Sequence, residues 1–318
     1  MEQLLEVCNL KKYFPTPKGM LHAVDDVSFT LTKKQTLGVV GESGCGKSTL
    51  GRTILGLTQA TEGQIYFHGK DITNASGKER KRLRSEMQII FQDPFSSLDP
   101  RKNVVNLIAE PLQINRVYRK KADLLAKVEE LMDVVGLAKR FADSYPHELD
   151  GGRRQRIGVA RALAMDPEFI VCDEPVSALD VSVQAQILNL LQDLQAQKQL
   201  TYMFITHDLS VVKHISDEII VMYLGCIVEK APTRDLFQNP LHPYTQGLLS
   251  AIPIPSLRNK KEKILLQGEL TSPINPKPGC RFAVRCPHAK ECCRCETPAL
   301  KDTGNGHYVA CHFIGGPK

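Results

Sequence analysis

The sequence predicts an α/β fold with a mainly parallel β-sheet, and two observations lead to that prediction. An apolar, strand-like run at 37–40 is followed at once by a glycine-rich segment and then by a plausible helix over 49–57. Later apolar runs at 87–91, 169–172 and 202–205 alternate with segments of helical spacing. Strands that alternate with helices usually form a parallel sheet covered by helices on both faces.

Before the glycine-rich segment, the chain reads as an antiparallel N-terminal β-subdomain. Apolar alternation or apolar runs occupy 4–7, 23–31 and 36–40, and the stretch 64–67 suggests a further hairpin. From about 101 to 161 the spacing of apolar residues turns helical, which predicts a helical subdomain inserted between two halves of the α/β core.

The glycine-rich segment has the pattern G-x-x-x-x-G-K-S of a phosphate-binding loop. Its three glycines let the backbone turn so that N–H groups point at phosphate oxygens, and the helix N-terminus adds partial positive charge. Lys47 can reach the β- and γ-phosphates, and Ser48 can ligate Mg²⁺. The alternative is an ordinary glycine-rich turn before a helix, which the strand and helix on either side disfavour. The expected nucleotide-binding residues of this loop are Gly41, Ser43, Gly44, Cys45, Gly46, Lys47, Ser48 and Thr49.

Polar residues follow three other predicted strands. Asp173 ends the run 169–172 and could hold Mg²⁺, and Glu174 could orient or deprotonate a water that attacks the γ-phosphate. His207 follows the next strand and could contact the γ-phosphate, although a lone histidine is more often structural. Gln92 follows the strand at 87–91, and its amide could ligate Mg²⁺ or the attacking water.

A second element of the phosphate-binding type lies at 148–157, where two glycines open a helix. With this element in place, the order of motifs resembles the ATP-binding subunits of ABC transporters over at least residues 4–250. The matching pieces are the loop 41–49, Gln92, the signature 149–156, Asp173-Glu174-Pro175, the loop 177–180 and His207. The resemblance implies that Phe14 stacks on adenine, with Tyr13 as the second candidate.

Three segments narrow the resemblance to the ATPase subunits of dipeptide and oligopeptide importers: 41–52, 89–101 and 242–245. It implies a subunit that binds ATP and Mg²⁺, closes a dimer on binding ATP and reopens it on hydrolysis. The implied partners are a paralogous ATPase subunit (a heterodimer, or a homodimer in isolation), two transmembrane permease subunits and, indirectly, an extracytoplasmic peptide-binding protein. Nucleic acid is not among them.

The signature departs from the family pattern L-S-G-G-Q, because this chain has Leu149, Asp150, Gly151, Gly152 and Arg153. In the family, the serine contacts the γ-phosphate bound to the opposite subunit. An aspartate there places negative charge beside a phosphate, which predicts an asymmetric dimer with one weakened site. Arg153 could compensate by reaching that phosphate. Alternatively, an arginine pairs with Asp150 and little changes.

Cysteines crowd the end of the chain. Of ten cysteines, six lie at 280, 286, 292, 293, 295 and 311, and in a reducing compartment this favours a metal site over disulfides. The resemblance extends to the C-terminal extension of peptide-importer ATPases and favours Cys280, Cys286, Cys293 and Cys311 as ligands, with Cys292 and Cys295 as extras. Four thiolates suit Zn²⁺ or a [4Fe–4S] cluster. Because paired C-x₂-C spacing is missing, we expect the [4Fe–4S] cluster, with Zn²⁺ as the alternative and disulfides third.

The organisation along the chain follows from these motifs. Prolines punctuate the sequence after 252, so we expect an ATPase domain at 1–252 and a cysteine-rich extension at 253–318. No apolar run approaches the roughly 20 residues of a membrane helix, and no signal peptide is visible. We therefore expect a peripheral protein at the cytoplasmic face of the cell membrane. The alternatives are a soluble ABC ATPase of translation or DNA repair, or a degenerate regulatory subunit. A single ATPase unit, no visible coiled coil, and intact Glu174 and His207 disfavour them.

Overall fold

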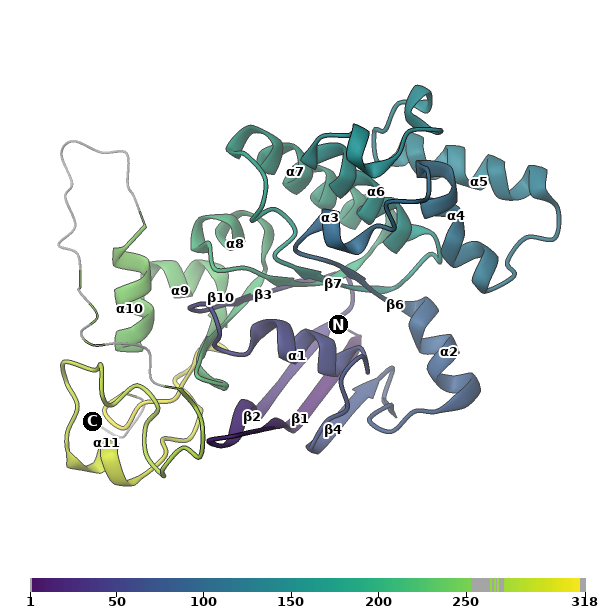
Figure 1. The fold of residues 1–318 in the computed structure, drawn as a ribbon. Coiled ribbons are helices and arrows are strands. Elements are labelled where there is room, and N and C mark those ends of the chain that lie inside the picture. Colours follow the sequence, from purple (N-terminus) through teal and green to yellow (C-terminus); the bar gives the residue numbers. More distant parts are fainter. Residues whose placement is uncertain (1, 253–263, 265, 267, 269–271, 315–318) are drawn as a thin grey trace, which may run out of the picture. The chain divides into compact units, whose positions relative to one another are not determined.

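The computed structural model describes residues 2–252, 264, 266, 268 and 272–314 (Figure 1). It divides into two compact units, one made of Met1–Ala75 with Phe204–Lys318 and the other of Ser76–Met203. The expected domain boundary near residue 253 falls outside the described residues and stays a prediction.

The first unit is formed by both ends of the chain. Its elements are β1 (Gln3–Thr16), β2 (Gly19–Thr32), β3 (Thr36–Val40), α1 (Lys47–Ile54), β4 (Glu62–Phe67), β5 (Lys70–Asp71), α8 (Leu209–Ile215), β9 (Glu218–Tyr223), β10 (Cys226–Pro232), α9 (Thr233–Gln238), α10 (Pro243–Ser250), α11 (Glu291–Cys295), β11 (Lys301–Asp302) and β12 (Tyr308–Val309). Strand β8 (Thr201–Ile205) carries the chain from the second unit into the first.

The predicted antiparallel N-terminal sheet is confirmed. Its strand order is β2-β1-β4-β5, and β1 pairs antiparallel with both β2 and β4. Leu5 lies opposite Leu31 in one ladder and opposite Phe67 in the other, and all three side chains are buried. These apolar side chains form the buried face that the alternation in the sequence indicated.

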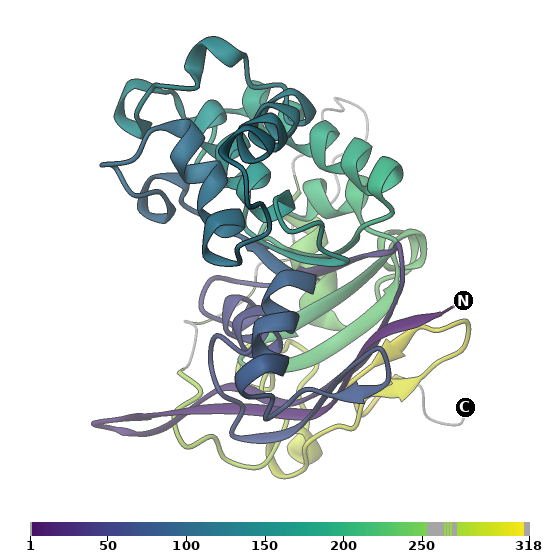
Figure 2. The same ribbon diagram turned by 90° about the vertical axis from the view of Figure 1, so that its right-hand side faces the viewer.

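The remaining strands of the first unit pair partly in parallel and partly antiparallel. This corrects the prediction of a mainly parallel sheet for this part of the chain. β3 pairs in parallel with β9, but β9 and β10 form an antiparallel hairpin. Leu224 and Gly225 between them both have positive φ, 44° and 86°, as a two-residue hairpin turn requires. Such a turn reverses the chain at once, whereas a parallel partner needs a long crossover. β12 and β11 then continue the sheet antiparallel from β10, and the yellow strands of Figure 2 mark them.

The second unit contains the expected helical segment. Its elements are α2 (Gly77–Glu86), β6 (Met87–Ile90), α3 (Pro94–Ser97), α4 (Val104–Ile114), α5 (Lys121–Val134), η1 (Lys139–Phe141), η2 (Pro146–Glu148), α6 (Gly151–Leu163), β7 (Phe169–Asp173) and α7 (Val181–Lys198). Helices α4, α5 and α6 pack on one another, and β6 pairs in parallel with β7 (Figure 1).

Side-chain caps and apolar faces explain where the helices of this unit begin and what they bury. Asn103 accepts a hydrogen bond from Asn106 N at the start of α4, and Asp180 accepts one from Val183 N at the start of α7. On α5, Val128 and Leu131 are fully buried, as the helical spacing predicted. Within the described part of the chain, no helix combines the length and the apolar character needed to cross a membrane.

Candidate functional site

The phosphate-loop segment 41–49 joins the buried strand β3 to helix α1, as the sequence predicted. Gly46 has a φ of 104°, and a Cβ atom there would lie 2.0 Å from the carbonyl oxygen of Ala23. At Gly41, a Cβ atom would lie 2.2 Å from the carbonyl oxygen of Met222. The loop is thus packed against neighbouring backbone at two positions that accept only glycine. Ser43 and Gly44 between them are exposed.

Lys47 is buried within this loop, with 4% of its surface exposed. Its Nζ donates to the carbonyl oxygens of Gly41 at 2.8 Å and of Glu42 at 2.9 Å. The ammonium group therefore closes the loop on itself. Cys45 is buried beside it, and burial raises the pKa of this thiol. Ser48 and Thr49 follow in the first turn of α1 and are half-buried.

The hairpin of β1 and β2 carries both aromatic candidates for adenine. The ring of Tyr13 stacks on His22 with 3.8 Å between ring centroids, and its hydroxyl donates to Asp25 at 2.5 Å. Phe14 is half-buried, and its ring faces Lys12 Nζ at 4.6 Å. His22 thus covers one face of Tyr13 and the Lys12 ammonium lies over Phe14, so both aromatics stay candidates for adenine.

His207 lies at the end of β8, where its neighbours place it near the strand that leads into the phosphate loop. The backbone N–H of Thr206 donates to the carbonyl oxygen of Val39, the penultimate residue of β3, at 3.1 Å. His207 itself is exposed, and the next residue, Asp208, caps α8 through Ser210 N. His207 and the phosphate loop therefore leave neighbouring strands at the same edge.

In the second unit, the structure brings together Gln92 and Glu174. Gln92 Nε2 donates to Glu174 Oε2 at 2.9 Å. Glu174 has a φ of 49°, a backbone region that non-glycine residues rarely adopt and that clusters at functional sites. Asp173, at the end of β7, is 1% exposed. The parallel pairing of β6 with β7 thus brings three groups to the same end of the two strands: the buried carboxylate of Asp173, the carboxylate of Glu174 on its strained backbone, and the amide of Gln92.

The expected Mg²⁺ ligands fit that ion by their chemistry. Ser48, Gln92 and Asp173 offer a hydroxyl, an amide and a carboxylate oxygen, the hard donors that Mg²⁺ prefers. Asp173 is buried at the carboxyl end of β7, where such a ligand belongs in an α/β sheet. The donor set therefore suits Mg²⁺ with one carboxylate and retained waters.

The signature residues open helix α6 and form an internal ion pair. Asp150 is the N-cap: its Oδ1 accepts from Arg153 N at 2.8 Å, and its Oδ2 accepts from Arg153 Nη1 at 2.5 Å. Leu149 is buried, and a Cβ atom at Gly152 would lie 2.6 Å from Val183 of α7. Arg153 thus offsets the charge of Asp150, and the pairing that the second alternative supposed is present.

A cavity of about 550 Å³ opens beside this ion pair. Three arginines line it, Arg140, Arg153 and Arg156, together with Asp150 and Gly151. Arg153 also lies over the ring of Phe141, 4.6 Å from its centroid. Asp180 also lines the cavity, so its wall carries both basic and acidic side chains.

The expected [4Fe–4S] cluster is wrong. Within the described residues, which include all ten cysteines, no group of three or more histidine, cysteine, aspartate or glutamate side chains is placed to hold a metal ion. The same finding applies to the zinc alternative. All ten cysteines are free thiols, so disulfides are also absent from the described residues.

The arrangement of the four expected ligands gives the physical reason. Cys280, Cys286, Cys293 and Cys311 all line one cavity of about 460 Å³ together with apolar side chains such as Phe282, but within the described residues they are not placed as a group that could hold a metal ion. Burial raises the pKa of Cys280 to about 11, which favours the neutral thiol in the metal-free chain. Cys292 and Cys295 lie on α11.

Sequence reasoning missed the residues of the C-terminal region, residues 272–314, that contact the phosphate loop. Arg285 Nη1 and Nη2 donate to the carboxylate of Glu42 at 2.7 and 3.1 Å. Tyr244, from the segment 242–245 that precedes this region, accepts from Glu42 N at 2.8 Å. Neither partner could be read from local spacing, since more than 200 residues separate each from Glu42.

Comparisons with known proteins agree with this geometry. The family model described as "ABC transporter" matches residues 24–177, and the model "Oligopeptide/dipeptide transporter, C-terminal region" matches residues 228–293. The first match includes the phosphate loop, Gln92, the signature and Glu174, whereas His207 lies outside both matches.

Relatives match over nearly the whole chain. The chain is 53% identical to the oligopeptide transport ATP-binding protein AppF of Bacillus subtilis (strain 168), over 98% of each chain. It is 49% identical to the dipeptide transport ATP-binding protein DppF of Escherichia coli (strain K12), over 98% of this chain and 95% of the relative. Among solved structures, the ADP- and Pi-bound dimer of the ATP-binding cassette MJ0796 has a TM-score of 0.66 and 27% identity, covering 73% of this chain and 99% of that one.

Proposed function

This chain belongs to the ATP-binding subunits of ABC transporters for oligopeptides and dipeptides, and we propose that it hydrolyses ATP to drive peptide import through such a transporter. One observation carries the proposal: proteins named for oligopeptide and dipeptide transport share about half of its residues over 98% of its length. The second family model, which is specific to these transporters, matches the part of the chain that begins at residue 228.

ATP binds first to the loop 41–49, with adenine against Phe14. The packed glycines hold the loop N–H groups toward the phosphates, and the N-terminus of α1 adds partial positive charge. Lys47, which bonds to the loop carbonyls of Gly41 and Glu42, exchanges these contacts for the β- and γ-phosphates. The exchange needs no new residue, because the ammonium already lies inside the loop.

Glu174 acts as the general base that orients and deprotonates the attacking water. Gln92 holds the carboxylate through its amide, and the strained backbone at Glu174 fixes the direction of the side chain. His207 contacts the γ-phosphate from the end of β8. Ser48, Gln92 and Asp173 would hold Mg²⁺, which would neutralise part of the phosphate charge.

The signature residues Leu149–Arg153 serve the site of a partner ATPase subunit. Asp150 caps α6, and its pairing with Arg153 reduces the negative charge offered to the partner's phosphate. Arg140 and Arg156 in the adjoining cavity add positive charge, which Asp180 in the same cavity offsets in part. A paired Asp150 supports a signature that stays active, while a serine donor is still missing, so the site it completes is the weaker of the two.

The partners are a paralogous ATPase subunit and two transmembrane permease subunits, with an extracytoplasmic peptide-binding protein acting indirectly. The subunit sits at the cytoplasmic face of the cell membrane. Action in translation or DNA repair is not favoured, because relatives of near-complete coverage are named for peptide transport.

Uptake of a labelled tripeptide into proteoliposomes tests the proposal. The complex of this chain with its paralogue and permeases is reconstituted into liposomes. ATP is enclosed inside the vesicles, on the same side of the membrane as the ATPase subunits. We expect ATP-dependent uptake that Glu174→Gln abolishes and that Glu168→Gln, at the opposite end of β7, leaves intact. Uptake that continues in the Glu174→Gln complex would contradict the proposal.

A further inference from the structure

We propose that Arg285 in the C-terminal region is a positioning residue for ATP binding, because it holds and neutralises Glu42 of the phosphate loop. The inference rests on the proposed ATP site at 41–49. It assigns to the C-terminal region a role in setting the affinity of that site for nucleotide.

Glu42 occupies the first x position of the G-x-x-x-x-G-K-S pattern, and each of its polar groups forms a hydrogen bond. Its backbone N–H donates to Tyr244 Oη at 2.8 Å, and its carbonyl oxygen accepts from Lys47 Nζ at 2.9 Å. Its two carboxylate oxygens accept from Arg285 at 2.7 and 3.1 Å. Arg285 therefore fixes the side chain of a residue whose backbone belongs to the phosphate-binding loop.

The ion pair is shielded from water, which makes it stronger than a surface pair. The exposed fraction of the side chain is 7% for Arg285 and 21% for Glu42. The guanidinium also lies 5.9 Å from the ring centroid of Tyr223, and its hydrogen bonds with Glu42 hold the pKa of Arg285 above the usual range. Bidentate, partly buried pairs keep a defined geometry and are screened less by salt.

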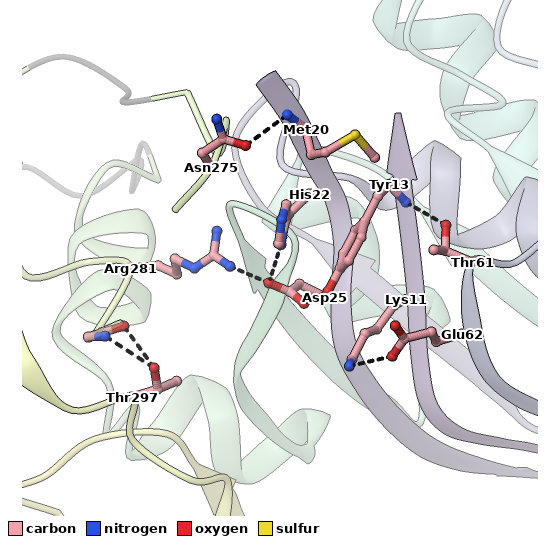
Figure 3. A network of polar contacts seen from close by, with 11 residues as sticks. Lys11, Tyr13, Met20, His22, Asp25, Thr61, Glu62, Asn275, Arg281 and Thr297 are labelled. Carbon is pink, nitrogen blue, oxygen red and sulfur yellow. Dashed lines mark hydrogen bonds and ion pairs between the residues drawn. The ribbon is translucent and has the colours of Figure 1, made fainter. Parts of the chain in front are cut away.

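A second arginine, Arg281, lies four residues before Arg285 and forms an ion pair with the hairpin of β1 and β2. Arg281 donates to the carboxylate of Asp25, which also accepts from Tyr13 Oη at 2.5 Å and lies 2.9 Å from His22 Nδ1 (Figure 3). The side chains of Arg281 and Asp25 are 13% and 16% exposed. The hairpin that carries Phe14 and the phosphate loop therefore both form ion pairs with the segment 281–285.

Backbone contacts extend this second anchor. Asn275 Oδ1 accepts from Met20 N at 2.8 Å (Figure 3). The N–H of His22 also donates to the carbonyl oxygen of Pro273 at 2.9 Å. The hairpin in turn meets the loop, since Asp25 N donates to Gly225 and Gly225 N donates to the carbonyl oxygen of Cys45. Residues 273–285 thus hold both the adenine side and the phosphate side of the proposed site.

The charge of Glu42 explains how its contact with Arg285 affects the affinity for ATP. ATP is strongly negative, and a carboxylate in the loop opposes its binding unless a cation neutralises it. Arg285 supplies that cation from the far end of the sequence. Without it, Glu42 keeps its charge, loses its fixed position and competes with the phosphates for Lys47.

Binding of MgATP to the full chain tests the inference, in a Glu174→Gln background that blocks turnover. Arg285→Gln leaves the carboxylate unpaired, so we expect ATP affinity to fall about tenfold. Glu42→Gln together with Arg285→Gln removes both charges and should restore affinity to within about twofold of the parent. Arg285→Lys keeps the charge and should bind nearly as well as the parent.

Arg294→Gln is the matched control, because Arg294 is an exposed arginine of the same region. Thermal unfolding of each variant separates folding from binding. A purely structural role for Arg285 would lower the midpoint without the recovery of affinity in the double variant, and that pattern overturns the inference. If Arg285→Gln does not fold, the double variant and Arg285→Lys carry the test, and tenfold weaker binding by either one overturns it.

Lys47→Ala distinguishes this inference from the proposed function. Loss of binding in Lys47→Ala, with parent-like binding in Arg285→Gln, refutes only the role of Arg285. Binding that survives Lys47→Ala refutes the ATP site itself.

Discussion

Gln92 and Glu174 lie side by side, with 2.9 Å between the amide nitrogen and a carboxylate oxygen, although 82 positions separate them in the sequence. The pairing of β6 with β7 explains the contact, since Ile90 lies opposite Cys172 in a parallel ladder. Each side chain comes two positions after that pair, so both leave the sheet at the same edge. A donor amide thus orients the carboxylate to which we assign the role of general base.

Replacing Glu174 by glutamine should stop hydrolysis and leave ATP binding in place. Glutamine has the shape of glutamate but cannot accept a proton, and general-base catalysis contributes about 10² to 10⁴ in rate. We expect kcat for ATP to fall by at least about a hundredfold, measured as phosphate release by the reconstituted transporter. Glu168→Gln is the control, and a Glu174→Gln complex of normal kcat would exclude Glu174 as the base.

Replacing Gln92 by alanine should lower kcat about tenfold, with a smaller change in the KM for ATP, because the base remains but is no longer held in position. Steady-state kinetics over a range of ATP concentrations give both constants. Gln88→Ala, on the same strand, is the matched control. A Gln92→Ala enzyme that changes KM alone would show that the amide serves binding rather than orientation of Glu174.

The signature variants should respond in opposite directions. Arg153→Gln alone removes the partner of Asp150 and leaves negative charge facing the neighbouring site, so ATPase activity of the assembled transporter should fall. Asp150→Ser with Arg153→Gln replaces the pair by a neutral donor and should raise activity. Asp166→Ser, an exposed site, controls for loss of an acidic residue. Equal activity of single and double variants would show that the pair has no part in hydrolysis.

Stability should rise with pH between about 4 and 6.5 because of His242. Burial lowers the pKa of this imidazole to about 4, and its Nδ1 accepts from Tyr244 N at the start of α10. In that pH window the unfolded chain binds a proton that the folded chain excludes. The free energy of unfolding should therefore lose up to about 3 kcal/mol as pH falls from 6.5 to 4.

Denaturant unfolding at several pH values measures this slope. His242→Asn keeps an acceptor for the helix cap but cannot titrate. The free energy of unfolding of this variant should therefore lack the pH dependence that His242 contributes. His147→Asn, an exposed histidine of the second unit, should leave the slope unchanged. A wild-type slope in His242→Asn would assign the pH dependence to other groups.

Local patterns in the sequence were enough for the phosphate loop and for the residues at the strand ends. Glycines at fixed spacing, followed by Lys-Ser at the start of a helix, form a pattern that is typical of phosphate binding. The structure shows why two of these glycines are needed, since a Cβ atom would collide with the backbone of Ala23 or Met222. The expectation of a mainly parallel sheet was right only in part. β3 pairs in parallel with β9 and β6 with β7, but the turn at Leu224 and Gly225 and the late strand β12 add antiparallel partners. The metal cluster was wrong because the spacing of cysteines along the chain does not fix the positions of their thiols. The four line one cavity, yet within the described residues they are not placed to hold a metal ion.

The sequence by itself determined the nucleotide chemistry of this protein, because a phosphate loop and a strand-end carboxylate act through short-range geometry that adjacent residues encode. Only the tertiary structure decided which charges neutralise one another. Asp150 pairs with Arg153 within one helical turn, but Glu42 finds its cation in Arg285, 243 positions away. Side chains so distant meet only when the chain has folded, so no local pattern records their contact.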